Sequence, residues 1–143
     1  MEDSAHIVWR EADAPAPAPA GLDPLVVAQL RQLDPDGSRG MLARLFEVYL
    51  QVHDRELLRW PAALATGDVP TLIAVVHKLK GSASSIGGRA FPALCQDIER
   101  ALRLRPEGLS EPVVQRQLDR FMALQAEFRA VVVAASRLPE GLR

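Results

Sequence analysis

One helix-like segment near the middle of the chain brings together an imidazole, an ammonium group and a residue without a side chain. An α-helix aligns residues at i, i+3, i+4 and i+7 on one side. Those positions hold His77, Lys80, Gly81 and Ser84. The opposite side is apolar, with residues at helical spacing: Leu72, Val76, Leu79, Ala83 and Ile86. Because His77 lies off this apolar stripe, we expect its ring to face solvent, where an imidazole nitrogen can attack phosphorus.

The neighbours of His77 suit the acceptance of a phosphoryl group. Glycine inside a helix costs about 1 kcal/mol relative to alanine, so Gly81 needs compensation, which close approach by a partner would supply. The Lys80 ammonium can offset phosphoryl charge, and Lys78 is an auxiliary candidate for the same task. These two are the only lysines of the chain. The ordinary alternatives, a solvated lysine and a glycine that only permits helix packing, stay open at this stage.

The motif around His77 resembles a known family. The runs His77-Lys78-Leu79-Lys80-Gly81-Ser82, Ile86-Gly87-Gly88 and Cys95-Gln96-Asp97-Ile98-Glu99-Arg100-Ala101 are similar to the histidine-containing phosphotransfer (HPt) domains of two-component phosphorelays. The resemblance covers about residues 22–136 as a helix pattern and is specific between 76 and 100. This chain departs mildly from the family pattern at three positions: Ile86 for Leu, Gly88 for Ala, and Ile98 for Leu before Glu99.

The resemblance implies a role for each residue of the motif. His77 would be phosphorylated, Lys80 would be the basic partner of the phosphoryl group, and Gly81 would admit the receiver domain. Family members often carry a polar residue, commonly Gln, on the preceding helix, and Gln51 is the candidate here for a hydrogen bond to the site. Ser84 shares the His77 face, without a role of its own.

The resemblance also implies a phosphorelay mechanism. His77 would take a phosphoryl group from the aspartyl phosphate of a response-regulator receiver domain and pass it to another receiver aspartate. We expect no cofactor or metal on this chain, and Mg²⁺ on the partner receiver. The sequence has no His-Glu-x-x-His motif, which argues against a bound metal. It also has no Gly-x-x-x-x-Gly-Lys-Ser/Thr loop, so we expect no autonomous ATPase or kinase activity.

Two other functions remain open. The first is a chemotaxis-kinase-type phospho-accepting domain, which carries a similar face and receives its phosphoryl group from an ATP-binding domain of the same protein. A proline-rich segment before the bundle argues against it, because such domains normally begin their polypeptide. The second is a helical docking module that regulates a partner without phosphotransfer, in which case a His77→Ala variant would stay active in the cell.

Composition excludes several other classes. With 17 basic and 18 acidic residues and dispersed arginines, the chain has no electrostatic footprint for nucleic acid. No apolar run approaches the ~20 residues that span a bilayer, and no signal peptide is recognisable. The single cysteine, Cys95, is expected in the core and suits a reducing compartment. We therefore expect a cytoplasmic location, or the cytoplasmic part of a membrane-bound sensor kinase. His6 and His53 are expected to have no functional role.

The chain divides into a tail, a domain and a second tail. Residues 1–21 end in alternating Pro and Ala and read as a flexible linker or tail, residues 22–137 as the HPt-like bundle, and 138–143 as a C-terminal tail. The linker suggests the C-terminal module of a hybrid sensor kinase, with histidine kinase domains in the same polypeptide. A free-standing protein with a tail is the alternative.

Helical periodicity and caps predict the fold. A short helix starts after Asp23-Pro24, and a long one runs over about 39–65, capped by Ser38 and kinked near Pro61. The site helix starts after Asp68 and ends at Gly87-Gly88. Two more helices follow, separated by a loop at 106–108. The expectation is an all-α, antiparallel four-helix bundle with a short additional N-terminal helix.

Overall fold

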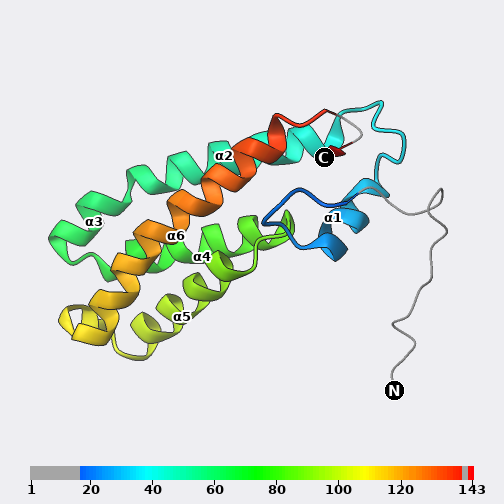
Figure 1. Ribbon diagram of the computed structural model, residues 1–143. Coiled ribbons are helices and arrows are strands. Elements are labelled where there is room, and N and C mark those ends of the chain that lie inside the picture. Colours follow the sequence, from blue (N-terminus) through cyan, green and yellow to red (C-terminus); the bar gives the residue numbers. More distant parts are fainter. Residues whose placement is uncertain (1–16, 140–141) are drawn as a thin grey trace, which may run out of the picture.

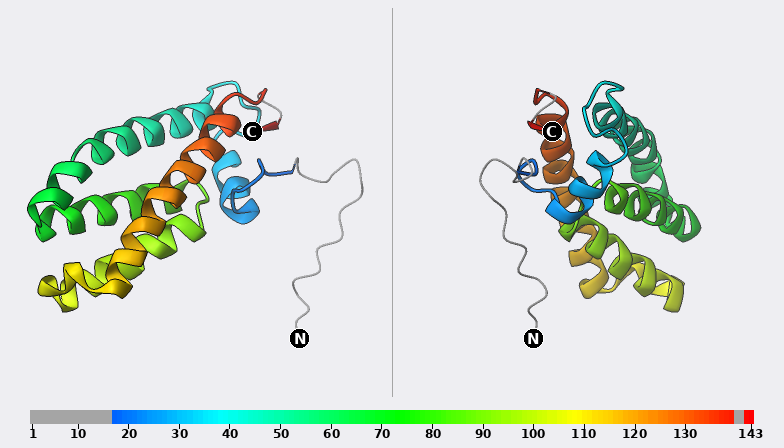
Figure 2. Two further views of the ribbon diagram at one scale, coloured as in Figure 1. Left: turned by 60° about the vertical axis from the view of Figure 1, so that its left-hand side comes forward. Right: turned by 90° about the vertical axis from the view of Figure 1, so that its right-hand side faces the viewer.

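The computed structural model describes residues 17–139 and 142–143, so His6 and most of the predicted N-terminal tail lie outside the described residues. The elements are α1 (Pro24–Arg31), α2 (Met41–Leu58), α3 (Trp60–Thr66), α4 (Val69–Ser85), α5 (Ala90–Leu104), a 3₁₀ turn (Pro106–Ser110) and α6 (Pro112–Ser136). Helix α3 continues the line of α2, and together they pack with α4, α5 and α6 (Figure 1). Helix α1 lies across one end of the bundle (Figure 2). The prediction of an antiparallel four-helix bundle with one extra N-terminal helix is confirmed.

Local capping residues set the start of two helices as predicted. The Asp23 carboxylate accepts a hydrogen bond from the backbone N–H of Leu25 at 2.9 Å, which caps α1. The Asp68 carboxylate accepts bonds from the backbone N–H and the hydroxyl of Thr71, at 3.2 and 2.7 Å. The start of the site helix α4 is therefore fixed by its own sequence.

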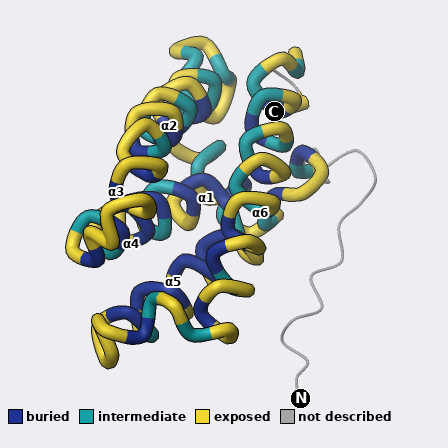
Figure 3. Tube along the Cα trace, turned by 90° about the vertical axis from the view of Figure 1, so that its left-hand side faces the viewer, coloured by how far each residue is buried: buried dark blue, intermediate teal, exposed yellow. Residues whose placement is uncertain are grey.

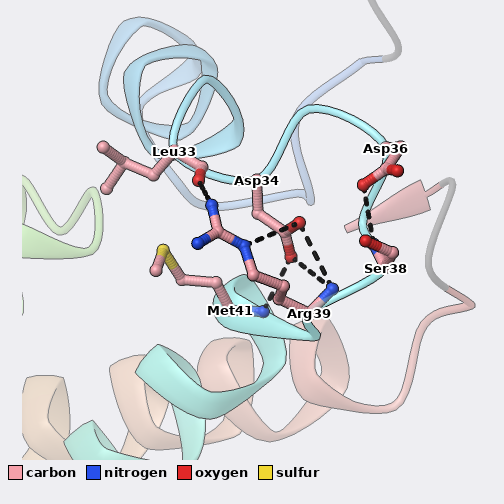
Figure 4. Close-up of polar contacts among 6 residues, drawn as sticks. All are labelled: Leu33, Asp34, Asp36, Ser38, Arg39 and Met41. Atoms are coloured by element: carbon pink, nitrogen blue, oxygen red, sulfur yellow. Dashed lines mark hydrogen bonds and ion pairs between the residues drawn. The ribbon is translucent and has the colours of Figure 1, made fainter.

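The predicted cap of α2 is wrong. The helix begins at Met41, after Gly40, and the Ser38 side chain does not cap it. Instead the buried carboxylate of Asp34, in the preceding loop, accepts backbone N–H bonds from Arg39 and Met41, each at 3.1 Å (Figure 4). A buried carboxylate in a low-dielectric site accepts N–H bonds more strongly than a surface hydroxyl, so Asp34 takes over the capping role.

The long helix predicted over residues 39–65 is divided at Arg59. Helix α2 ends at Leu58, and α3 starts with Trp60 and Pro61 in its first turn. Proline has no N–H for the helical ladder and its ring clashes with the preceding turn, so it starts a helix more easily than it continues one. The Trp60 ring stacks on Phe121 of α6 with centroids 4.2 Å apart, which anchors this junction to the core.

The apolar stripe of α4 faces the core. All five residues of the predicted stripe are buried, and so is Cys95 on α5. Buried and exposed positions alternate along α4 and α5 in the trace of Figure 3. Burial raises the pKa of the Cys95 thiol to about 12, so it stays protonated. Packing α4 on its apolar side leaves the other side to solvent. Within the described residues, no helix combines the length and the apolar character that crossing a bilayer requires.

The turn between α4 and α5 is fixed from two directions. Gly87 has φ +100°, a left-handed conformation that favours glycine, and a Cβ on Gly88 would lie 2.9 Å from both the Ala83 carbonyl oxygen and the Phe128 ring. The backbone N–H of Asp23 donates to the Gly87 carbonyl at 2.8 Å. These contacts set the position of α5 beside the His77 face of α4.

A buried histidine is part of the core. His53 on α2 is 1% exposed; its Nδ1 accepts from the Tyr49 hydroxyl at 2.8 Å, and its Nε2–H donates to the Gln125 side-chain oxygen at 2.7 Å. These partners satisfy both ring nitrogens of a neutral imidazole. The structure therefore gives His53 a structural role in the core.

We expect the free energy of unfolding to depend on pH through His53. Burial lowers the pKa of His53, against smaller opposing effects of Gln125 and Asp54. The unfolded chain binds the proton more readily, so the free energy of unfolding falls as pH drops below about 6.5. Between pH 7.5 and 5.5 the loss is at most about 1.4 kcal/mol. Urea unfolding at the two pH values measures it.

The matched variant is His53→Gln, which removes the titrating group from the same place. It is expected to be less stable at pH 7.5 and to lose most of the difference between the two pH values. A wild-type protein with equal urea midpoints at pH 7.5 and 5.5 would contradict this account of His53.

Candidate functional site

The outer side of α4 carries the residues singled out from the sequence. The His77 side chain is 61% exposed, and Gly81 and Ser84 are also exposed. Lys80 is partly covered, with 26% of its side chain exposed, because it leans toward α5. The structure thus places all four residues on one accessible face, with His77 near the middle of a regular helix.

A carboxylate from α5 joins the two key side chains. Glu99 Oε2 lies 2.9 Å from His77 Nδ1, and Glu99 Oε1 accepts from the Lys80 ammonium at 2.8 Å. Arg103, one turn further along α5, donates to Oε2 through Nε at 2.9 Å, and its Nη2 forms an ion pair with the same oxygen at 2.8 Å. Glu99 itself is only 7% exposed, so these donors provide the polar contacts that a buried carboxylate requires.

The donors around Glu99 keep it ionised. The hydrogen bond from Lys80, followed by those from Arg103 and His77, lowers the pKa of Glu99 to about 2, although burial alone would raise it. An ionised carboxylate can only accept hydrogen bonds, so His77 Nδ1 must carry the proton of the bond. This assigns the tautomer from the hydrogen-bond partner. In the neutral ring the other nitrogen, Nε2, therefore has the lone pair.

We expect Glu99 to affect the rate at which His77 accepts a phosphoryl group. In a Glu99→Ala variant no carboxylate holds Nδ1–H, and the transfer rate from a phosphorylated receiver should fall about tenfold or more. Glu99→Gln keeps a side-chain oxygen that can accept a hydrogen bond from Nδ1–H, so its transfer rate should fall less than that of Glu99→Ala. Transfer kinetics, together with ¹⁵N spectra of the ring tautomer, measure the effect.

Equal rates and equal tautomer populations in wild type, Glu99→Ala and Glu99→Gln would contradict that role. A useful check on folding is the thermal melt, because Glu99 sits against the core face of α5.

The structure leaves open space beside Gly81. A Cβ at Gly81 would have no neighbour within 4 Å among the described residues, so no packing contact in that part of the chain requires a glycine there. Gly81 lines a groove of about 600 Å³ between α4 and α5, together with Lys80, Ser84, Gly88, Arg89, Pro92, Ala93, Gln96 and Asp97. The open space argues against the packing alternative and fits a surface that another molecule approaches closely.

Two other predicted site residues lie apart from these contacts. Lys78 is exposed next to His77, and Gln51 is exposed on α2. In the described part of the chain Gln51 makes no hydrogen bond with His77. The imidazole of His77, on α4, instead bonds Glu99 on the next helix, α5. The role predicted for Gln51 stays a prediction.

Sequence reasoning assigned no role to Glu99 or Arg103. A signal was present: Glu99 stands among the buried positions of α5, between Ile98 and Leu102. A charged residue on an apolar helix face needs polar partners, and α5 itself offers Glu99 just one, Arg103 at i+4. The sequence thus indicated that Glu99 has a further partner on another helix. The link to His77, 22 residues earlier, depends on how the two helices pack.

No metal site is formed by the residues that the structure describes, since no three His, Cys, Asp or Glu side chains gather closely enough to share an ion.

Comparisons with known proteins agree with this geometry. The family model of the Hpt domain matches residues 44–134. A similar solved structure is that of histidine-containing phosphotransfer protein B (HptB) from Pseudomonas aeruginosa PAO1, with 23% sequence identity and a TM-score of 0.67. The alignment covers 82% of this chain and 96% of that one. No curated protein sequence matched. Because the family model spans more than half of the chain, the chain belongs to the Hpt domain family.

Proposed function

We propose that His77 is the residue through which this histidine phosphotransfer domain carries a phosphoryl group between receiver domains. The observation that carries the proposal is the hydrogen bond from His77 Nδ1–H to the Glu99 carboxylate, in a side chain that is 61% exposed, which leaves the Nε2 lone pair of the neutral ring available for attack. Membership in the Hpt family makes the chain an intermediate of a phosphorelay and gives receiver domains as its kind of partner.

The proposed transfer follows from the two ring nitrogens. The Nε2 lone pair attacks phosphorus of an aspartyl phosphate, the N–P bond forms, and the P–O bond to aspartate breaks as the carboxylate leaves. Nδ1 keeps its proton, so the ring becomes an imidazolium that faces the Glu99 carboxylate. Transfer to the next receiver reverses these steps, with a second aspartate oxygen as the nucleophile.

The neighbouring side chains support this chemistry in different ways. Lys80, 2.8 Å from Glu99, is near enough to His77 to offset charge on the phosphoryl group. Gly81 leaves space for the partner backbone, and exposed Lys78 adds positive charge nearby. Gln51 and Ser84 are proposed only as polar contacts at the edge of the partner surface. Mg²⁺ is proposed to arrive with the receiver, whose acidic residues would bind it.

The proposed cellular context is a larger signalling protein. The Pro-Ala segment before the bundle supports a C-terminal module of a hybrid sensor kinase, with histidine kinase domains in the same polypeptide. In that arrangement the domain works in the cytoplasm, even where the kinase itself is bound to a membrane.

The proposal is tested by following a ³²P label through two receivers. A phosphorylated receiver should label the chain with the acid-labile, base-stable behaviour of phosphohistidine, and a second receiver should then remove the label. If the chain is labelled only by a kinase domain supplied with ³²P-labelled ATP, and by no phospho-receiver, the chemotaxis-kinase-type domain would be favoured instead. Absence of label from every receiver and kinase that binds the chain would leave the docking module as the better explanation.

A further inference from the structure

The contacts of Arg103 go beyond what the family motif assigns. Arg103 and His77 both bond the same oxygen, Glu99 Oε2, so the guanidinium lies within two hydrogen-bond lengths of the imidazole. Helix α5 fixes this arrangement, because Glu99 and Arg103 are separated by one helical turn. Arg103 is therefore the second cation, after Lys80, held at the edge of the His77 ring.

The charges around Glu99 are unbalanced while His77 is unmodified. One carboxylate faces the two cations Lys80 and Arg103, in addition to the neutral ring. The cluster therefore carries one net positive charge. A phosphoryl group on the ring brings up to two negative charges, for which Glu99 is a poor neighbour and the two cations are good ones. Because the phosphorylated ring is itself an imidazolium, phosphorylation would take the cluster from one net positive charge to near neutrality, and the two cations would then have phosphoryl oxygens to pair with.

Arg103 is free to change partners. Its side chain is 57% exposed, so the guanidinium has room to turn away from Glu99, and the buried carboxylate keeps its contacts with Lys80 and His77 when it does. A guanidinium has five N–H donors in a planar fork that suits phosphate oxygens, and in the unmodified site its hydrogen bond to Glu99 comes from Nε, with Nη2 in ion-pair contact.

The geometry points to Arg103 as a second counter-cation of the phosphoryl group: it is held by Glu99 while His77 is free and turns to the phosphoryl oxygens once His77 carries them. This inference rests on the proposed function of His77. It makes Arg103 a residue that stabilises phosphohistidine and so shifts the transfer equilibrium toward this chain. Lys80 would stay beside it, since its side chain is less exposed.

The first test uses a phospho-receiver that labels the wild-type protein. In an equilibrated mixture, Arg103→Gln should lower the ratio of phosphohistidine to phospho-receiver about three- to tenfold, because the phosphoryl group loses a charged donor. Arg103→Lys keeps the positive charge but lacks the planar guanidinium, so its ratio should lie between those of wild type and Arg103→Gln. The matched control is Arg100→Gln, since Arg100 is exposed on the same helix and lines the same shallow depression as Arg103. It should change the ratio less than twofold.

A second test needs no receiver. Phosphoramidate, a small phosphoryl donor, is used to phosphorylate His77 in ¹⁵N-labelled protein, and the Arg103 Nε–H resonance is assigned from its loss in Arg103→Gln. The Arg103 Nε–H resonance should shift when His77 is phosphorylated, while the Arg100 Nε–H resonance should not. A merely structural Arg103 would not produce this shift.

The outcomes separate this inference from the proposed function. Equal ratios for Arg103→Gln and Arg100→Gln, or an Arg103 resonance that does not move when His77 is phosphorylated, would overturn the role of Arg103 and leave His77 as the acceptor. If neither phosphoramidate nor any phospho-receiver modifies His77, the proposed function itself fails.

Discussion

Replacing His77 with glutamine is expected to abolish phosphoryl acceptance, lowering label from a phospho-receiver by at least about 1,000-fold, to background. Glutamine keeps the helix and a polar surface but has no nitrogen lone pair able to form the N–P bond. Transfer kinetics with ³²P-labelled receiver measure the effect. The melting temperature should hardly change, because the His77 side chain is 61% exposed and packs against little.

The control for that variant is Arg120→Gln, a change of an exposed residue on α6, which should accept label like wild type. His53 is buried, so it should not replace His77 as an acceptor. Acid-labile label that persists in His77→Gln would place the acceptor elsewhere and overturn the assignment.

A second large effect is expected from filling the space beside Gly81. Because no atom of residues 17–139 or 142–143 lies within 4 Å of a Cβ at this position, Gly81→Leu should fold normally and gain about 0.5–1 kcal/mol from better helix propensity. The leucine side chain would stand one turn from His77 and hold a receiver away from the ring. We expect transfer from a phospho-receiver to fall about 100-fold, since small displacements of reacting atoms are this costly.

Phosphoramidate separates the steric effect from the chemistry. This small donor should label His77 in Gly81→Leu almost as fast as in wild type, because its approach needs little room. Ala126→Leu, which adds a leucine at an exposed position on α6, is the matched control and should leave both reactions unchanged. If Gly81→Leu receives label from the receiver at the wild-type rate, Gly81 does not serve partner access.

The face of α4 could be predicted from the sequence because it depends on one helix. Helical periodicity separates the buried stripe from the His77 side, and Asp68 caps the helix with contacts to a residue three positions later. Such short-range rules transfer directly from sequence to structure. The same holds for the positions of the bundle helices, since each carries its own amphipathic pattern, although the break at Arg59 that divides the predicted long helix into α2 and α3 was not predicted.

The contact between His77 and Glu99 could not be derived in that way. It joins two helices, and its geometry depends on the turn at Gly87 and on packing of α5 against α4 and α6. Similarly, the cap of α2 comes from Asp34, seven residues before Met41, across a loop that carries no periodic signal. Sequence patterns rank residues along one element, but they do not say which side chains meet between elements.

The two lysines of this chain have a practical consequence for finding its partners. Apart from the amino terminus, Lys78 and Lys80 hold the only primary amines, and both lie on the His77 helix. An amine-reactive bifunctional reagent would therefore join the folded domain to a neighbour mainly at this surface. Lys80, held by Glu99, should react more slowly than the exposed Lys78. Protection of Lys78 from such a reagent would report, without any engineered label, that a partner covers His77.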